Sequence, residues 1–232
     1  MYWSDAPRQA PALPDDVIDL AYRIVCDALP LDHAHALSSA LLAELPWLAD
    51  ETLAGVHLIH IAESGNGWIR PEFSADEVLP VSRRTRLRLR LPRQRLEDAQ
   101  ALVGQVMDIQ GHRMEVGEAK VQPLVPLSAL FARHVAMPDE TTAADEAAFL
   151  DWAAGELRRL GVPASRMMCG RGHLLQTPAG QVVTRSLMVA DLEPPHALEL
   201  QRRGIGERRL LGCGLFIGHK DIAAVQRSGD GT

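Results

Sequence analysis

The sequence predicts an α+β protein built from two tandem ferredoxin-like (RRM-like) domains, each with the element order β-α-β-β-α-β. Three observations lead to this prediction. Stretches with alternating apolar residues and stretches with apolar residues at helical spacing occur in that order in both halves of the chain. The length of 232 residues suits one or two domains, and an apolar fraction of 47% is enough to form their cores. A glycine-rich stretch near the C-terminus separates the last predicted helix from the last predicted strand.

In the first half, residues 83–91 show the most regular alternation. Three leucines face one side of this strand and three arginines face the other: Leu87, Leu89, Leu91 against Arg86, Arg88, Arg90. Pro30 ends the first strand, and Asp32 is a candidate N-cap for the first helix. The predicted elements are strands over 15–28, 55–62 and 83–91, helices over 33–47 and 96–103, and one or two short strands within 111–121. We expect a disordered arm over 1–14 and a first domain over 15–123.

The second half repeats this outline without a close sequence repeat. Its clearest element is an amphipathic helix over 145–160, which Gly161 and Pro163 end. The predicted elements are strands over 130–137, 166–176, 181–190 and 215–217, and helices over 145–160 and 197–203. We expect a second domain over 124–222 and a flexible tail over 223–232.

Composition excludes several classes of protein. No run of about 18 apolar residues could span a membrane, and the N-terminus does not resemble a secretory signal. The three cysteines, Cys26, Cys169 and Cys213, have no paired spacing, which argues against a disulfide framework and a structural zinc site. We therefore expect a cytoplasmic protein without a metal or other cofactor.

The formal net charge of −6 argues at first against a nucleic-acid partner. The distribution of charge matters more, because the acids concentrate within 139–156 and the arginines lie elsewhere. A bias toward arginine over lysine also arises from a GC-rich genome. Charge alone therefore leaves both interpretations open.

The glycine-rich stretch over 204–214 (GIGERRLLGCG) has two interpretations. Its backbone N–H groups could form an anion-binding concavity beside Arg208 and Arg209, or it could be a tight helix-to-strand turn without a ligand. A dinucleotide-binding loop needs a strand before it and a helix after it, which is the reverse of the order here. A P-loop needs a Gly-Lys pair followed by Ser or Thr, and this stretch has none.

Several stretches together resemble one family. The pattern G-x-G-x-x-R-x-x-G-x-G between a helix and a final strand resembles the C-terminal loop of the RAMP superfamily. Within it, the chain is most similar to the CRISPR-associated repeat-processing endoribonucleases (the Cas-six family), and to their myxobacterial-type branch. The stretches that carry this narrower resemblance are 29–33, 55–59, 82–87, 126–133 and 212–216.

The resemblance implies two ferredoxin-like domains and cleavage of CRISPR repeat RNA, the precursor of guide RNAs. Members cut without a metal or other cofactor: the 2′-hydroxyl attacks the adjacent phosphorus, giving a 2′,3′-cyclic phosphate. The implied partners are the repeat stem-loop and other subunits of a CRISPR effector complex. Two alternatives stay open: a RAMP-type subunit that binds RNA without cutting it, and a ferredoxin-like protein that binds a small molecule.

Histidine is the residue type best suited to proton transfer near neutral pH. The resemblance places the catalytic histidine in the first domain, on or just after the first helix. His57, at the start of the second strand, is the first choice, followed by His33 and His35. His60 has the opposite strand parity to His57 and is weaker. The second catalytic group remains unassigned.

The residues expected to bind RNA form two arginine-rich groups and the glycine loop. Solvated strand faces also carry such charges, which is the alternative for the arginines. Few aromatic residues lie near them, so phosphate and shape recognition of a stem-loop fits better than base stacking. The expected RNA-binding residues are Arg83, Arg84, Arg86, Arg88, Arg166, Arg171, Arg185, Gly204, Gly206, Arg208, Arg209, Gly212 and Gly214.

Overall fold

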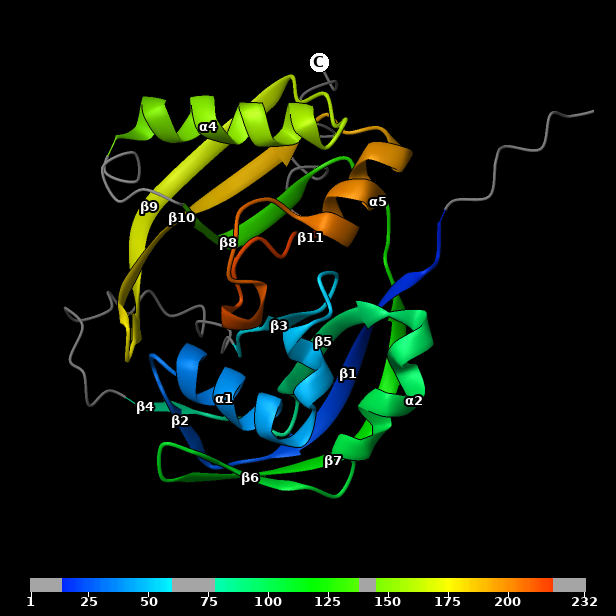
Figure 1. The fold of residues 1–232 in the computed structure, drawn as a ribbon, viewed down its shortest axis with the longest axis vertical. Helices are drawn as coiled ribbons and strands as arrows, with labels where there is room; N and C mark the ends of the chain where they lie inside the picture. Colours follow the sequence, from blue (N-terminus) through cyan, green and yellow to red (C-terminus); the bar gives the residue numbers. More distant parts are fainter. Residues whose placement is uncertain (1–13, 60–77, 138–144, 219–232) are drawn as a thin grey trace, which may run out of the picture.

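The computed structural model describes residues 14–59, 78–137 and 145–218, which form two antiparallel sheets with helices on one face of each. Figure 1 shows the N-terminal sheet with α1 and α2 in the lower half and the C-terminal sheet with α4 and α5 in the upper half. The expected arm and tail lie outside the described residues, apart from residue 14. None of the helices in these ranges is long and apolar enough to cross a membrane.

The N-terminal sheet has the strand order β3-β5-β1-β7-β6. Its first four strands have the ferredoxin-like arrangement, in which the first and third of them in the chain lie at the centre. A short separate ribbon pairs β2 with β4. The elements are β1 (Val17–Val25), β2 (Ala28–Pro30), α1 (Ala34–Glu44), β3 (Gly55–His57), β4 (Val78–Pro80), β5 (Arg86–Pro92), α2 (Leu96–Ala99), β6 (Val106–Ile109) and β7 (His112–Pro123).

The C-terminal sheet has the order β11-β8-β10-β9, which is the same arrangement again. The prediction of two ferredoxin-like domains is therefore confirmed. The elements are β8 (Leu130–Ala136), α4 (Glu146–Arg159), β9 (Arg166–Thr177), β10 (Gly180–Ala190), α5 (Pro194–Arg203) and β11 (Ile217–Gly218).

Each sheet buries one apolar face against its helices. In the first domain, Leu20 and Tyr22 of β1 and the three leucines of β5 pack against α1 and α2. The Tyr22 hydroxyl donates to the carbonyl of Ala99 at 2.7 Å, and burial raises its pKa. Asp145 caps α4 by accepting from the backbone of Ala147 and Ala148, so this helix begins close to the predicted residue.

The boundaries of several elements differ from the sequence prediction. The first strand ends at Val25, and β2 is a separate strand rather than its continuation. The predicted short strands within 111–121 are one 12-residue strand, β7, which forms a hairpin with β6. The predicted helix over 96–103 has only one α-helical turn, followed by a 3-10 turn. Propensity alone does not determine such boundaries because tertiary contacts decide them.

Candidate functional site

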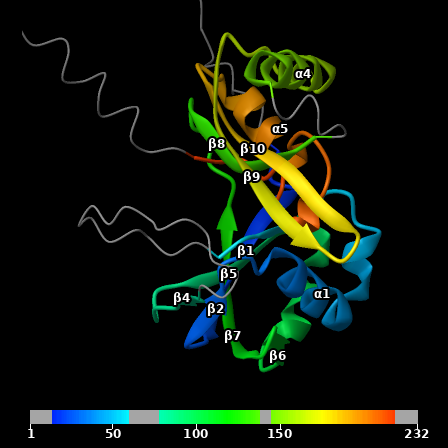
Figure 2. The same cartoon turned by 90° about the vertical axis from the view of Figure 1, so that its left-hand side faces the viewer.

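The face of the N-terminal sheet opposite α1 and α2 carries polar residues in register. Because side chains alternate along strands, residues paired across strands share a face. The strand registers give three rows: Gly55–Arg90–Asp19, His57–Arg88–Ala21 and Arg86–Arg23. In Figure 2, α1 lies to the right of β1, β5 and β7, so this face is directed to the left. We call it the open sheet face.

One end of the open sheet face is covered by the C-terminal domain. Arg90 is 1% exposed there and holds Asp19 with two hydrogen bonds, Nε to Oδ1 at 2.8 Å and Nη2 to Oδ2 at 3.0 Å. Its Nη1 donates to the carbonyls of Gln201 and Phe216, both at 2.8 Å. Burial opposes the charge on Asp19, but the charge of Arg90 and the hydrogen bonds from His57 and Arg90 outweigh it and keep the pKa far below its usual value.

His57 lies where the covered part of this face meets the exposed part. Its Nε2 is 3.4 Å from Oδ1 of Asp19, and 13% of its side chain is exposed. Burial lowers the pKa of His57, and the charges of Arg90 and Arg88 add to this effect, while Asp19 opposes it. The ring is therefore neutral at pH 7 and able to accept a proton.

The exposed end of the face is cationic. Arg23 and Arg86 are direct cross-strand neighbours, and Lys120 lies opposite Ala21 on β7. Within the described part of the chain, neither these residues nor Arg88 forms an ion pair with a carboxylate. The Nε of Arg88 is buried without a hydrogen-bond partner there. Like charges placed opposite one another are destabilising, so a bound anion would stabilise this arrangement.

Arg83 and Arg84 are exposed in the turn before β5, adjacent to this end. Sequence reasoning placed Arg86, Arg88 and Arg90 together on a charged face, but Arg90 is buried and ion-paired. The sequence analysis did not identify Arg23 or Lys120 as part of this face. The alternation of polar and apolar residues along β1 and β7 was the signal that could have found them.

The other two candidate histidines have different surroundings. His33 is 3% exposed and uses both ring nitrogens: Nδ1 donates to the carbonyl of Pro30 at 2.9 Å, and Nε2 accepts from the N–H of Ile59 at 3.1 Å. Burial lowers its pKa. These bonds connect the start of α1 to the end of β2 and to the segment after β3, which is a structural role. His35 is partly exposed on α1, with Nε2 3.4 Å from the Ser39 hydroxyl. His60 lies outside the described residues.

The structure explains the glycine loop without a ligand. Gly204, Gly206, Gly212 and Gly214 all have positive φ. A Cβ at Gly206 would lie 2.5 Å from the carbonyl oxygen of Ala136, and one at Gly204 or Gly214 would collide with the loop's own backbone. The loop folds back on itself and packs against β8 and Leu58, so its glycines permit close packing of the chain.

The two arginines of this loop differ. Arg208 is exposed, with a φ of 66°. Arg209 is partly buried and donates to four carbonyls, those of Leu53, Ala54, Arg202 and Arg203. Since the first two belong to the N-terminal domain, Arg209 connects the two domains. We therefore do not retain Arg209 or the four glycines in the RNA-binding surface proposed below.

The second arginine group lies on the hairpin of β9 and β10. Arg166 is 3.5 Å from Asp191, and Arg185 donates to the carbonyl of Gly170. The side chain of Arg171 is outside the described part of the structure. The hairpin approaches α1, where the N–H of Gln176 donates to Asp32, so it lies on the helix side of the N-terminal sheet (Figure 2). The hairpin and the open sheet face with His57 therefore lie on opposite sides of the N-terminal sheet.

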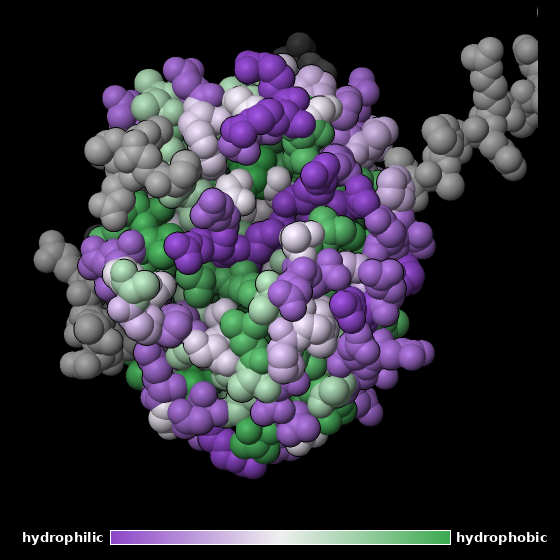
Figure 3. All heavy atoms as spheres, viewed as in Figure 1, coloured by the Kyte–Doolittle hydropathy of each residue, from purple (hydrophilic) through white to green (hydrophobic). Residues whose placement is uncertain are grey.

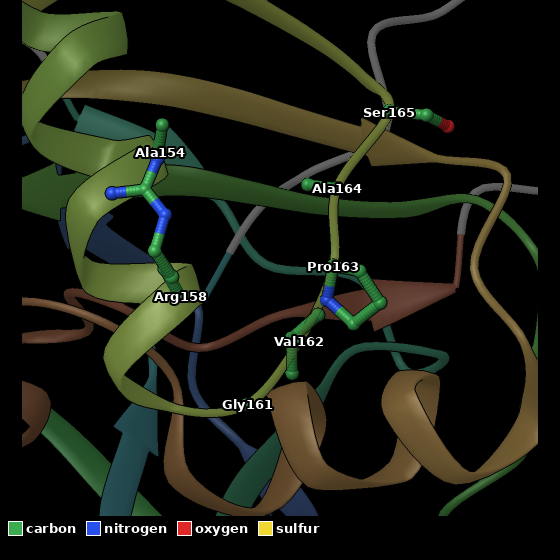
Figure 4. Close-up of a pocket in the computed structure, with 7 residues that line it drawn as sticks. All are labelled: Ala154, Arg158, Gly161, Val162, Pro163, Ala164 and Ser165. Atoms are coloured by element: carbon green, nitrogen blue, oxygen red, sulfur yellow. The ribbon is translucent and has the colours of Figure 1, made fainter.

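The pocket at the end of α4 and the surface over α4 and α5 do not group residues suited to catalysis among those described. A shallow pocket of about 510 Å³ at the end of α4 is lined by Arg158 and small or apolar residues, and Figure 4 shows Arg158 and Ser165 pointing apart. On the face seen in Figure 3, hydrophilic residues predominate over α4 and α5, and hydrophobic residues form only small patches. Among the described residues, no three potential metal ligands are grouped together.

Comparisons with known proteins agree with this fold. A solved structure titled "CRISPR associated protein Cas6" superposes with a TM-score of 0.56 at 10% identity, covering 88% of this chain and all of that one. Another, titled "Characterization of a Cas6-related gene from Pyrococcus furiosus", gives 0.59 at 12% identity and covers 88% and 99%. A relative from Myxococcus xanthus (strain DK1622), called "CRISPR-associated endonuclease Cas6", is 34% identical over 212 residues, 91% of this chain and 86% of its own length. The family profile described as "Cas6 Crispr" matches residues 18–221, and the chain therefore belongs to the Cas6 family.

Proposed function

We propose that this protein is a metal-independent endoribonuclease that cuts CRISPR repeat RNA to produce guide RNAs. Family membership and the endonuclease name of the Myxococcus xanthus relative support the reaction class. The observation that carries the proposal is the position of His57, a neutral histidine at the border of the cationic open sheet face. Repeat RNA would lie on this face, with its phosphates near Arg23, Arg86 and Arg88.

The reaction requires a base, positive charge and correct positioning. His57 takes the proton of the 2′-hydroxyl while the 2′-oxygen attacks the adjacent phosphorus. The bond from phosphorus to the 5′-oxygen breaks, and that oxygen takes a proton from solvent, leaving a 2′,3′-cyclic phosphate and a free 5′-hydroxyl. Arg88, the cross-strand neighbour of His57, stabilises the charge that develops on the phosphoryl oxygens. General base catalysis contributes about 10²–10⁴-fold in rate.

The test is cleavage of the cognate repeat RNA in EDTA by single variants. His57→Ala is expected to lose about 100-fold or more in rate while RNA affinity changes little. His35→Ala is the matched test of the other accessible candidate, and His196→Ala, on α5, is the control. If only the His35 variant loses cleavage, the general base is His35 on α1 and not His57. Strict dependence on a metal would refute the mechanism.

The alternative is a RAMP-type subunit that binds RNA without cutting it. A solved structure titled "An RAMP protein binding different RNA substrates" matches with a TM-score of 0.57 at 14% identity, which shows a shared fold only. This alternative predicts RNA binding without cleavage by the wild-type protein. The remaining alternative is a protein that binds a small molecule. It predicts that the salt-dependent RNA affinity expected from phosphate contacts is absent.

A further inference from the structure

His57 is one end of a chain of contacts that crosses into the other domain. Its Nε2 faces Oδ1 of Asp19, Asp19 is held by Arg90, and Arg90 is bound to two carbonyls of the C-terminal domain. These links come from three neighbouring strands and from α5 and the segment before β11. The proposed base is therefore fixed by groups that themselves have little freedom.

Arg90 leaves the Asp19 carboxylate a single orientation. It holds both carboxylate oxygens from a planar guanidinium, and its Nη1 is bound to the carbonyls of Gln201 and Phe216. Rotation of the carboxylate would break at least one charge-assisted hydrogen bond inside the protein. Oδ1 is thus held toward His57.

The charge of Asp19 decides which ring nitrogen of His57 carries the proton. An ionised carboxylate only accepts hydrogen bonds, so the Nε2 that faces it must carry hydrogen. Nδ1 is then the nitrogen with a lone pair, and it has no hydrogen-bond partner within the described part of the chain. A separation of 3.4 Å is long, as is common for catalytic hydrogen bonds before substrate binds.

We propose that Asp19, held by Arg90, is a positioning residue that keeps His57 in the tautomer whose Nδ1 accepts the 2′-proton. This inference rests on the function proposed above for His57. In the step, the proton leaves the 2′-oxygen for Nδ1 as the new oxygen–phosphorus bond forms. Asp19 remains ionised and stabilises the imidazolium, and the proton later returns to solvent.

Asp19→Asn tests the inference, because asparagine offers one oxygen in place of two. Oδ1 accepts from Arg90 Nε and also faces His57, so the amide can place either its oxygen or its NH₂ group there. With the NH₂ group there, the ring accepts at Nε2 and carries its proton on Nδ1, where it cannot act as the base. With the oxygen there, the uncharged amide no longer stabilises the imidazolium. An equivalent substitution in the Ser-His-Asp triad lowers the rate by about 10⁴-fold through the wrong tautomer. Here we expect a loss of about 100-fold or more in cleavage, with RNA affinity little changed.

The control is Asp16→Asn. Asp16 is also on the N-terminal side of the domain interface and accepts from Arg202 at 2.6 Å, but it forms no hydrogen bond or ion pair with His57 in the described part of the structure. It should retain the wild-type rate. Melting temperature, measured for both variants, separates a general loss of stability from a loss of positioning.

The second readout is the ¹⁵N NMR spectrum of the histidine side chains, with His57 assigned from its own variant. The wild-type protein should show hydrogen on Nε2 of His57, and Asp19→Asn should increase the fraction of the ring that carries hydrogen on Nδ1. Hydrogen on Nδ1 in the wild type would overturn the inference even if the variant does not fold. If His57→Ala cuts normally, the proposed base is wrong. If His57→Ala is inactive while Asp19→Asn keeps its rate and tautomer, only the positioning role is refuted.

Discussion

Replacing Arg209 by methionine should destabilise the protein even though Arg209 belongs to a loop expected to bind RNA. Its guanidinium donates to the carbonyls of Leu53 and Ala54 at 3.1 Å, and to that of Arg202, also at 3.1 Å. A fourth bond reaches the carbonyl of Arg203 at 2.6 Å. Burial and the charge of Arg90 lower the pKa of Arg209, but the group stays charged.

The size of the effect follows from these contacts. Three of the four bonds are partly buried, and a buried carbonyl left without a donor costs about 1–3 kcal/mol. Removing a partly buried charge returns part of this, so we expect a net loss of about 3 kcal/mol. For a chain of this length, that lowers the melting temperature by about 6–12 °C. Arg208→Asn is the matched control, because Arg208 is exposed beside Arg209 and asparagine tolerates the left-handed backbone at this position. A calorimetric scan in which Arg209→Met melts with the wild type would refute the proposed interdomain role.

Three further predictions concern the loop, pH and RNA. Gly206→Ala should lower the free energy of unfolding, measured with denaturant, by more than about 1 kcal/mol, because φ is positive and Ala136 is close. Gly155→Ala, in open space on α4, should raise it by about 0.5–1 kcal/mol. Burial lowers the pKa of His134 to about 3, so the folded state disfavours the proton that the unfolded chain binds below about 6.5. Stability should therefore fall as pH drops from about 6.5 toward 3, by at most about 1.4 kcal/mol per pH unit from this group, and His134→Gln should flatten the pH dependence of the melting temperature. Arg86→Ala should lower the slope of log affinity against log salt by about 1, and an unchanged slope would remove this residue from the RNA surface.

The fold could be predicted from sequence because its signals are local. The alternation in β5, the spacing of leucines in α1 and the turn before β10 each indicate one element, and their order indicates the topology. Strand β7 was underestimated because its exposed half, beyond Met114 and Val116, alternates less clearly. The limits of elements depend on partners that local sequence does not reveal.

The candidate site was only partly predictable, because burial on the open sheet face is a tertiary property. The alternation correctly placed Arg86, Arg88 and Arg90 on one side. It could not show that the C-terminal domain covers Arg90 and leaves Arg86 accessible. Asp19 had no signal of its own in the sequence, since its importance comes from residues more than 35 positions away.

The glycine loop illustrates the same limit from the opposite direction. Positive φ and close approach are needed both in an anion-binding loop and in a loop that packs against its own chain. The two possibilities differ only in which groups lie close to the glycines. In this structure the close groups are the backbone of Gly214 and Ala136 and the side chain of Leu58.

The separation of the arginines constrains how RNA can reach the proposed base. The hairpin of β9 and β10 lies on the α1 side of the N-terminal sheet, whereas His57 lies on the open sheet face (Figure 2). A phosphate group near His57 therefore lies on the same face as Arg88 and Arg86, and the hairpin lies on the opposite side of the sheet. If His57 is the base, the hairpin contacts RNA away from the cut, and its removal should weaken binding more than it slows the chemical step. If His35 is the base, this order reverses, because His35 and the hairpin share one side of the sheet.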